Sequence, residues 1–340
     1  MGISEEEIFG RSSRAEPATP GSYGLPPRGF RLPCGTRLGP VRLQVADLDR
    51  SLAYYGGTLG LRTLETEPGR ALLGVRAPAA ATPAPRSIPT STPTSSDTPL
   101  VELRERRGAR SVPTRGRTGL FHFAILLPDR PALGRFVRHL GEIGARAGAA
   151  DHRVSEALYL QDPDNLGIEV YADRPRDDWR RVGRELKMAT DPLDLAGLLD
   201  AAGEEPWDGL PARTVLGHVH LHVGDLAAAA AFYPEGLGFD RTVWDYPGVL
   251  FLGAGGYHHH LGTNVWAGAQ APPPADGEAQ LLEWTIELPD AASLASAAES
   301  LERAGYARER VADGGGEPGL AIRDPWGTRA RLRVATPAAG

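Results

Sequence analysis

A motif that occurs twice constrains the fold of this chain more than any other feature. Residues 39–48 read Gly-Pro-Val-Arg-Leu-Gln-Val-Ala-Asp-Leu, and residues 217–226 read Gly-His-Val-His-Leu-His-Val-Gly-Asp-Leu. Each copy alternates like a half-buried strand and then reaches an Asp-Leu pair that starts a short helix. The matching register indicates an internal duplication. The copies differ at three alternate positions, which hold His218, His220 and His222 in the second copy and Pro40, Arg42 and Gln44 in the first.

A second kind of unit also occurs twice. Residues 119–129 form a predicted strand that ends in Pro-Asp, and residues 281–290 match them. In the first of these units a helix follows and stops at Gly144, and two further strands are joined by an Asp-Pro-Asp-Asn turn at 162–165. The other unit has Asp-Pro-Trp-Gly at 324–327. We therefore predict an α+β fold made of four βαβββ units in tandem.

Two stretches have the composition of unstructured chain. Residues 1–35 are rich in Ser, Gly, Pro and Arg, and residues 77–99 are a Pro/Thr/Ser tract with almost no large apolar side chain. Such segments bury too little surface to offset the entropy of ordering them. We predict a disordered N-terminal extension at 1–35 and a mobile loop at 77–99. Two domains, 36–175 (the first two units) and 216–336 (the last two), are then joined by a connector at 176–215.

Charge and hydropathy exclude several classes of partner. The net charge of -6 and the pI near 5.9 argue against a nucleic-acid groove. No apolar run approaches the ~18 residues of a membrane span, and the polar N-terminus has no signal-peptide core. A lone Cys34 fits a reducing compartment. We expect a cytoplasmic protein with no nucleic-acid or membrane partner.

The four units resemble those of the vicinal oxygen chelate superfamily, which includes glyoxalases, bleomycin-resistance proteins and extradiol dioxygenases. The likeness covers roughly residues 37–335, and its most specific stretches are 118–129, 155–175, 216–226 and 255–266. These stretches are most similar to the two-domain catechol 2,3-dioxygenases, including those of bacilli. The resemblance implies two vicinal oxygen chelate domains whose paired units curve their mixed sheets into open barrels, with a metal ion inside.

Three polar side chains in otherwise apolar strands are candidate metal ligands. A facial Fe(II) site needs two imidazoles and one carboxylate on one side of the ion, and inward-pointing side chains of curved strands converge on one axis. His122, His218 and Glu169 meet these needs, and they occupy the positions at which the family places its His, His and Glu ligands. Taken singly, His122 also fits a hydrogen-bonded core histidine, and Glu169 an ordinary edge-strand carboxylate.

The chain departs from the better-known extradiol enzymes, in which the third and fourth units supply all three ligands. Here the fourth unit has Glu283 and Arg331 at the expected His and Glu positions, and the first unit has Pro40 in place of His. The second and third units must therefore face each other across one barrel. The first and fourth would form a structural pair.

The remaining candidates would surround the metal. The resemblance implies that Tyr159 hydrogen-bonds a metal-bound hydroxyl, that a His in the run 257–260 donates a proton near O2, and that His152 belongs to an Asp-His pair beside the site. Neighbouring residues of a strand face opposite ways, so either His259 alone or His258 and His260 point inward, and we favour His259. His220 and His222 share the strand face of His218. We assign His220, His222 and His258 to substrate contacts. Trp266, Trp284 and Phe123 fit either core or pocket wall.

The resemblance implies an oxidoreductase of aromatic hydrocarbon catabolism. It would cleave catechol or a substituted catechol with O2 to 2-hydroxymuconic semialdehyde, using Fe(II), with Mn(II) as the alternative metal. A homo-oligomer is compatible with the sequence. Two other functions stay open: a metal-free, bleomycin-resistance-like protein that sequesters its ligand, and another metal-dependent enzyme of the glyoxalase or fosfomycin-resistance type.

Overall fold

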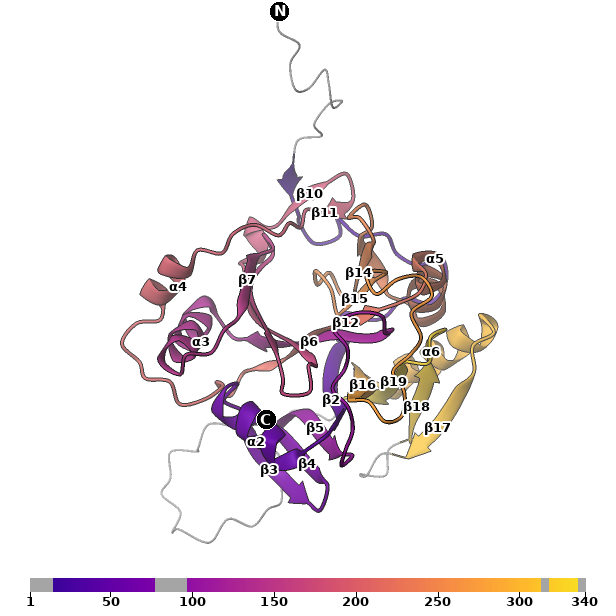
Figure 1. Ribbon diagram of the computed structural model, residues 1–340. Helices are drawn as coiled ribbons and strands as arrows, with labels where there is room; N and C mark the ends of the chain where they lie inside the picture. The colour runs from indigo at the N-terminus through magenta and orange to yellow at the C-terminus, as the bar shows by residue number, and fades with distance from the viewer. Residues whose placement is uncertain (1–14, 77–96, 313–317, 336–340) are drawn as a thin grey trace, which may run out of the picture.

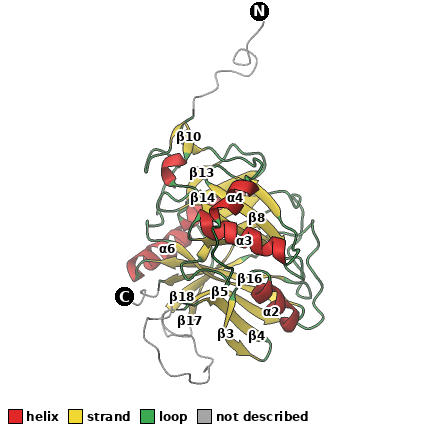
Figure 2. Ribbon diagram, turned by 90° about the vertical axis from the view of Figure 1, so that its left-hand side faces the viewer, coloured by secondary structure: helices red, strands yellow, loops and turns green. Residues whose placement is uncertain are grey.

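Two eight-stranded mixed sheets, lying one above the other in Figure 2, make up most of the molecule. The computed structural model describes residues 15–76, 97–312 and 318–335. The first sheet has the order β13(Asp240–Val243), β14(Val249–Gly253), β15(Leu261–Asn264), β12(Val215–His222), β6(Gly119–Leu127), β9(Gly167–Asp173), β8(Ser155–Gln161) and β7(Gly148–Asp151). The second has the order β17(Arg308–Ala312), β18(Pro318–Arg323), β19(Arg329–Val334), β16(Gln280–Leu288), β2(Arg37–Val45), β5(Thr98–Glu105), β4(Arg70–Val75) and β3(Arg62–Glu67).

The order of the strands shows which units pair. In the first sheet β12, from the third unit, lies antiparallel to β6, from the second. In the second sheet β16, from the fourth unit, lies antiparallel to β2, from the first. The predicted pairing of the second unit with the third is therefore confirmed. Each sheet combines strands from both halves of the chain, 36–175 and 216–336, so neither half completes a sheet alone.

The helix of each unit starts at the same kind of N-cap residue. An aspartate is the N-cap of α2(Leu48–Gly57), α3(Arg130–Glu142), α5(Leu226–Ala230) and α6(Ala291–Arg303), and its side chain accepts the backbone N–H three residues later. In the third unit α5 continues as a π-helical segment, η2(Ala231–Leu237), which ends at Gly238 with φ near 101°. The helices lie outside the sheets in Figure 1. The described residues contain no helix long and apolar enough to cross a bilayer.

Residues 15–35 differ from the expectation of disorder. β1(Glu16–Pro17) pairs with β10(Arg180–Val182), which pairs with β11(Glu185–Leu186). Tyr23 and Leu32 of this segment are buried. Contacts with distant parts of the chain, rather than a core of its own, order this segment. Its local sequence therefore shows no periodicity that would reveal the order. Residues 1–14 lie outside the described residues, as do 77–96 of the predicted mobile loop; β5 already begins at Thr98.

The connector contains short elements rather than a bare linker. It holds η1(Arg176–Asp178), β10, β11 and α4(Leu195–Ala201), and α4 packs on α3. Between β11 and α4, residues 188–190 line a cavity together with residues of the first sheet. The connector therefore supplies part of the candidate site.

Candidate metal centre

Three neighbouring strands of the first sheet bring together the predicted ligands. His218 lies on β12, His122 on β6 and Glu169 on β9, which are consecutive in the sheet. Glu169 Oε2 is 2.9 Å from His122 Nε2 and 3.0 Å from His218 Nε2, and the two Nε2 atoms are 3.3 Å apart. All three side chains are buried. Their ligand atoms form the one group of His, Cys, Asp or Glu side chains in the described ranges that is placed to hold a metal ion.

The spacing of these atoms fits a facial metal site. Ligand atoms about 2.1 Å from an ion and at right angles to one another are about 3.0 Å apart, close to the distances found here. Burial raises the pKa of Glu169, but His218 and His122 outweigh this and hold that pKa well below its usual range. Burial lowers the pKa of His122. A carboxylate beside two imidazoles is the ligand set that Fe(II) and Mn(II) accept.

Close packing fixes His218 in this position. Gly217 precedes it on β12, and a Cβ at Gly217 would lie 1.7 Å from Tyr171 Oη. Only glycine therefore lets β12 pass Tyr171, whose ring also packs on His218 at 5.0 Å between centroids. Gly262 likewise makes room for the His220 ring, since a Cβ at this position would lie 2.8 Å from that ring.

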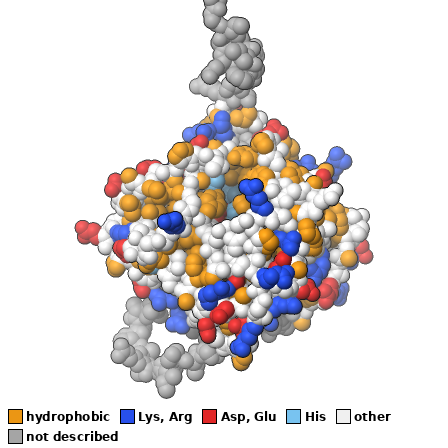
Figure 3. Space-filling view, viewed as in Figure 1, with side chains coloured by type: hydrophobic (Ala, Val, Ile, Leu, Met, Phe, Trp, Pro, Cys, Tyr) orange, Lys and Arg blue, Asp and Glu red, His pale blue; other side chains and the backbone are white. Residues whose placement is uncertain are grey.

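A cavity of about 270 Å³ opens above the three candidate ligands. Its other lining residues are Phe121, His152, Tyr159, Met188, Ala189, Thr190, His220, Tyr246, Phe251, His259 and Trp266. Figure 3 shows histidine side chains in a hollow surrounded by hydrophobic ones. The volume is near the lower end of ligand pockets, about 300–1,000 Å³, and therefore suits a compound with a single ring.

Tyr159 and His152 form a hydrogen-bonded pair in this cavity. His152 Nδ1 is 2.7 Å from the carbonyl oxygen of Ala189, so this nitrogen carries the proton and donates. His152 Nε2 then accepts the Tyr159 hydroxyl proton at 2.5 Å. The Tyr159 oxygen keeps its lone pairs free to accept a further hydrogen bond. Burial, followed by the charge of Glu169, raises the pKa of Tyr159 well above its usual value.

The other predicted contacts divide between cavity and core. His259 and His220 line the cavity, and burial lowers the pKa of each well below its usual value. His258 lies outside the lining, fully buried beside Asp173. His222 also lies outside, with Nδ1 2.6 Å from Asn264 Oδ1. Burial lowers the pKa of His260 to about 3, and its Nδ1 accepts the Ala254 N–H.

The aromatic candidates divide in the same way. Trp266 lines the cavity and is 48 % exposed, whereas Trp284 and Phe123 are fully buried in the core. Phe121 was missed because it neighbours His122, and simple alternation would point it away. The register of β6 and β12 shifts beside it, between His220 and Leu221, and such a bulge re-aims a side chain. Met188, Ala189 and Thr190 carried no signal in the sequence.

Comparisons with known proteins bear on this site. The family model of the Glyoxalase/Bleomycin resistance protein/Dioxygenase superfamily matches residues 37–170 and 215–337. The chain belongs to this superfamily. It is 42% identical over 297 residues to the Catechol-2,3-dioxygenase of Bacillus subtilis (strain 168), covering 85% of this chain and 94% of that protein. The resemblance inferred from the motifs is thereby confirmed, and so is the α+β fold.

Solved structures of low sequence identity share the fold. A putative dioxygenase from Bacillus subtilis subsp. subtilis str. 168 aligns with a TM-score of 0.59 at 14% identity, covering 91% of this chain and 87% of its own. Glyoxalase I from Zea mays aligns with a TM-score of 0.51 at 21% identity, covering 88% and 92%. At these identities the likeness concerns architecture alone.

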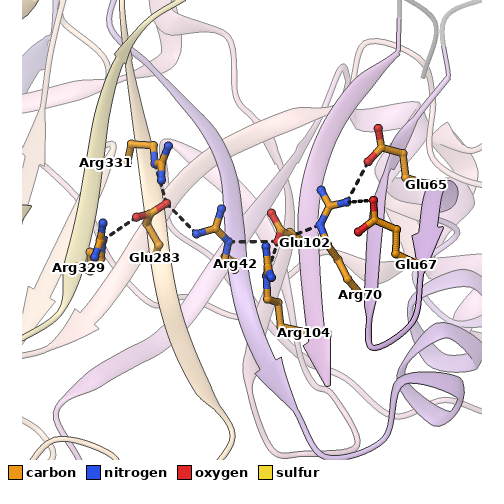
Figure 4. Close-up of polar contacts among 9 residues, drawn as sticks. All are labelled: Arg42, Glu65, Glu67, Arg70, Glu102, Arg104, Glu283, Arg329 and Arg331. Carbon is orange, nitrogen blue, oxygen red and sulfur yellow. Dashed lines mark hydrogen bonds and ion pairs between the residues drawn. The ribbon is translucent and has the colours of Figure 1, made fainter. Parts of the chain in front are cut away.

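The second sheet of this superfamily member carries salt bridges where the first carries the candidate ligands. Glu283 and Arg331 stand at the positions of His122 and Glu169, and they pair at 2.8 Å. Figure 4 shows Glu283 also joined to Arg329 and Arg42, and Arg42 joined in turn to Glu102. The charged groups of this sheet that the structure describes pair with one another as an ion-pair ladder, and none of them belongs to a group of ligand atoms placed to hold a metal ion.

Proposed function

We propose that the chain is an extradiol dioxygenase that cleaves catechol or a substituted catechol with O2 to a 2-hydroxymuconic semialdehyde. Fe(II), or alternatively Mn(II), would be held by His122, His218 and Glu169. The observation that carries the proposal is the cluster of these three side chains beneath an aromatic-lined cavity. The 42% identity to a protein named Catechol-2,3-dioxygenase supports the same reaction.

A ferrous ion in a site of two His and one carboxylate supplies the redox chemistry that lets O2 react with the ring. Tyr159 would orient the diol, since its oxygen can accept a hydrogen bond from one hydroxyl while its own O–H donates to His152 Nε2. His152 is thus placed to take up a proton relayed through Tyr159. The carbonyl of Ala189 holds His152 in the tautomer that this role needs.

His220 and His259 would contact the substrate from the other side of the cavity. Asn264 Nδ2 lies 3.0 Å from His220 Nε2, which leaves the Nδ1–H of His220 as a donor. Phe121, Phe251 and Trp266 provide apolar walls for an aromatic ring and reduce the access of water. His222 and His258 would act only through their neighbours.

The test is anaerobic loading with Fe(II), then addition of catechol and O2, with the yellow semialdehyde followed by absorbance. Wild type is expected to turn yellow and His218→Ala to stay colourless. His139→Gln is the matched control, because His139 is also buried but lies on α3, bonds the Gly57 carbonyl of α2 and does not line the cavity. A colour change that persists in His218→Ala contradicts the assignment of His218.

Metal binding is measured separately from turnover by thermal unfolding. An ion present at 100 times its dissociation constant stabilises the folded state by about 2.7 kcal/mol, so metal should raise the Tm of wild type and His139→Gln but not that of His218→Ala. A wild type that binds aromatic ligands but no metal would instead be a sequestering protein. Metal binding with glyoxalase or fosfomycin-inactivating activity and no ring cleavage would place the chain in another class of the superfamily.

A further inference from the structure

A line of three side chains connects the end of β9 with the cavity. Asp173, the last residue of β9, has Oδ1 2.9 Å from His258 Nε2. His258 Nδ1 is in turn 2.6 Å from His259 Nδ1. His258 is fully buried and lies outside the cavity, whereas His259 lines it. Asp173 therefore reaches the cavity only through two imidazole rings.

The hydrogen-bond polarity of this line follows from the chemistry of its members. An ionised carboxylate only accepts, so His258 Nε2 must carry a proton and donate it to Asp173. A neutral imidazole has a single N–H, and His258 Nδ1 is then an acceptor. His259 must consequently donate from Nδ1. Its Nε2 is left with a lone pair, and no hydrogen-bond partner for that atom is found among the described residues.

Two tyrosines support the carboxylate end of the line. Tyr257 Oη donates to Asp173 Oδ1 at 3.2 Å. Tyr171 Oη is 2.7 Å from Tyr257 Oη and must be the donor there, because the proton of Tyr257 already points at Asp173. Burial raises the pKa of both tyrosines well above the usual value, so both remain protonated. Asp173 is thus the acceptor for both Tyr257 and His258, and Tyr171 supports it through Tyr257.

Packing keeps the ring of His258 in one orientation. It lies against Trp179 at 5.4 Å and Tyr257 at 4.1 Å between centroids. Its backbone carbonyl accepts the Thr242 hydroxyl at 2.6 Å. The hydroxyl of Tyr23 donates at 2.5 Å to the carbonyl of Gly256 in the same loop. A ring that cannot turn over has a fixed assignment of its two nitrogens.

We propose that Asp173 is a positioning residue that acts through His258 to hold His259 with its proton on Nδ1 and its Nε2 lone pair facing the cavity. The tautomer assignment stands on the hydrogen-bond geometry alone. Its use rests on the proposed function: a catechol hydroxyl donates a hydrogen bond to Nε2 of His259, opposite the hydroxyl that Tyr159 orients. The two ring hydroxyls would then meet acceptors on both sides of the cavity.

The experiment reads the tautomers directly. Full-length protein with ¹⁵N-labelled histidine is loaded with Zn(II), which is diamagnetic, and long-range ¹H–¹⁵N spectra distinguish Nδ1–H from Nε2–H rings. Wild type should show His258 as Nε2–H and His259 as Nδ1–H. In Asp173→Leu and in His258→Phe, His259 should lose its fixed Nδ1–H form. Asp173→Asn should retain both tautomers, because its Oδ1 can still accept.

Tyr257→Phe is the matched control, since it removes one donor from the same carboxylate and leaves the line intact. Its tautomers should equal those of wild type. With Fe(II) and catechol, kcat of Asp173→Leu should fall about 10²-fold, the lower end of what a proton-transfer group contributes, while His139→Gln stays close to wild type.

The outcomes separate the two proposals. A wild-type spectrum with His259 as Nε2–H, or one in which Asp173→Leu leaves His259 unchanged, overturns the role of Asp173 whatever the activity. Correct tautomers together with an iron-loaded wild type that cleaves no catechol overturn the proposed function and leave the hydrogen-bond line standing. If wild type has the expected tautomers but Asp173→Leu has an unimpaired kcat, then Asp173 does not contribute to turnover.

Discussion

The turn between β8 and β9 holds a carboxyl group whose pKa makes stability depend on pH. Asp162 is 5 % exposed. Its Oδ1 accepts the backbone N–H groups of Asp164 and Leu166, at 2.9 and 2.8 Å, and its Oδ2 accepts the Tyr55 hydroxyl at 3.1 Å. Burial raises the pKa of Asp162 from 3.8 to about 6, although the three hydrogen bonds oppose the change.

The magnitude follows from linkage. Between pH 4 and 6 the folded state binds more protons than the unfolded state, so the free energy of unfolding falls as the pH rises through this window. The pKa of Asp162 differs by about two units between the folded and unfolded states. At about 1.4 kcal/mol per unit, this difference changes the free energy of unfolding by about 3 kcal/mol. Asp162→Asn removes the titrating group and keeps an oxygen for the two backbone donors. The free energy of unfolding of this variant, relative to that of wild type, should rise by about 3 kcal/mol from pH 4 to pH 7.

Urea unfolding at a series of pH values from 4 to 7 measures this difference. Asp208→Asn, at a carboxylate whose side chain is 94% exposed, controls for the substitution itself. Asp324→Asn should show a change of the same sign, because burial also raises the pKa of Asp324, which is bonded to Tyr233 as Asp162 is to Tyr55. A difference between Asp162→Asn and wild type that is constant over this range, or that falls with rising pH, would refute the reasoning.

Three further predictions concern the two sheets. Glu283→Gln should lower the free energy of unfolding measured in urea by about 3 kcal/mol, because it removes the buried negative charge that Arg42, Arg329 and Arg331 share. The metal-induced rise in Tm should persist, and unchanged stability would contradict the prediction. Gly217→Ala should lower the free energy of unfolding by at least about 2 kcal/mol and abolish the metal-induced rise in Tm, because its Cβ must displace Tyr171 beside His218. Normal metal binding by this variant would contradict the prediction. Trp266→Ala should raise KM for catechol about tenfold, the equivalent of about 1.4 kcal/mol of lost aromatic contact, with less change in kcat, and an unaltered KM would show that Trp266 does not touch the substrate.

The sequence determined the units and their local structure. Alternation along residues 39–48 and 217–226 is a local property, and so is the aspartate that starts each helix; all four predicted helices have that cap. The absence of candidate ligands from the first and fourth units was also readable, and it implied that the second and third units must meet. The strand order confirms that implication.

The tertiary structure decided which side chains share the cavity. Alternation gives each strand two faces, but it does not say where a register shift breaks the pattern, as one does beside Phe121. Nor does it say which way the His258-His259 pair turns, because residues 257–260 form no regular strand and their rings are placed by Asp173, Trp179 and Thr242. Local patterns also do not show that residues 15–35 are ordered or that residues 188–190 form part of the cavity wall. Contacts between segments far apart along the chain have no local pattern, and these contacts shape the space above His122, His218 and Glu169.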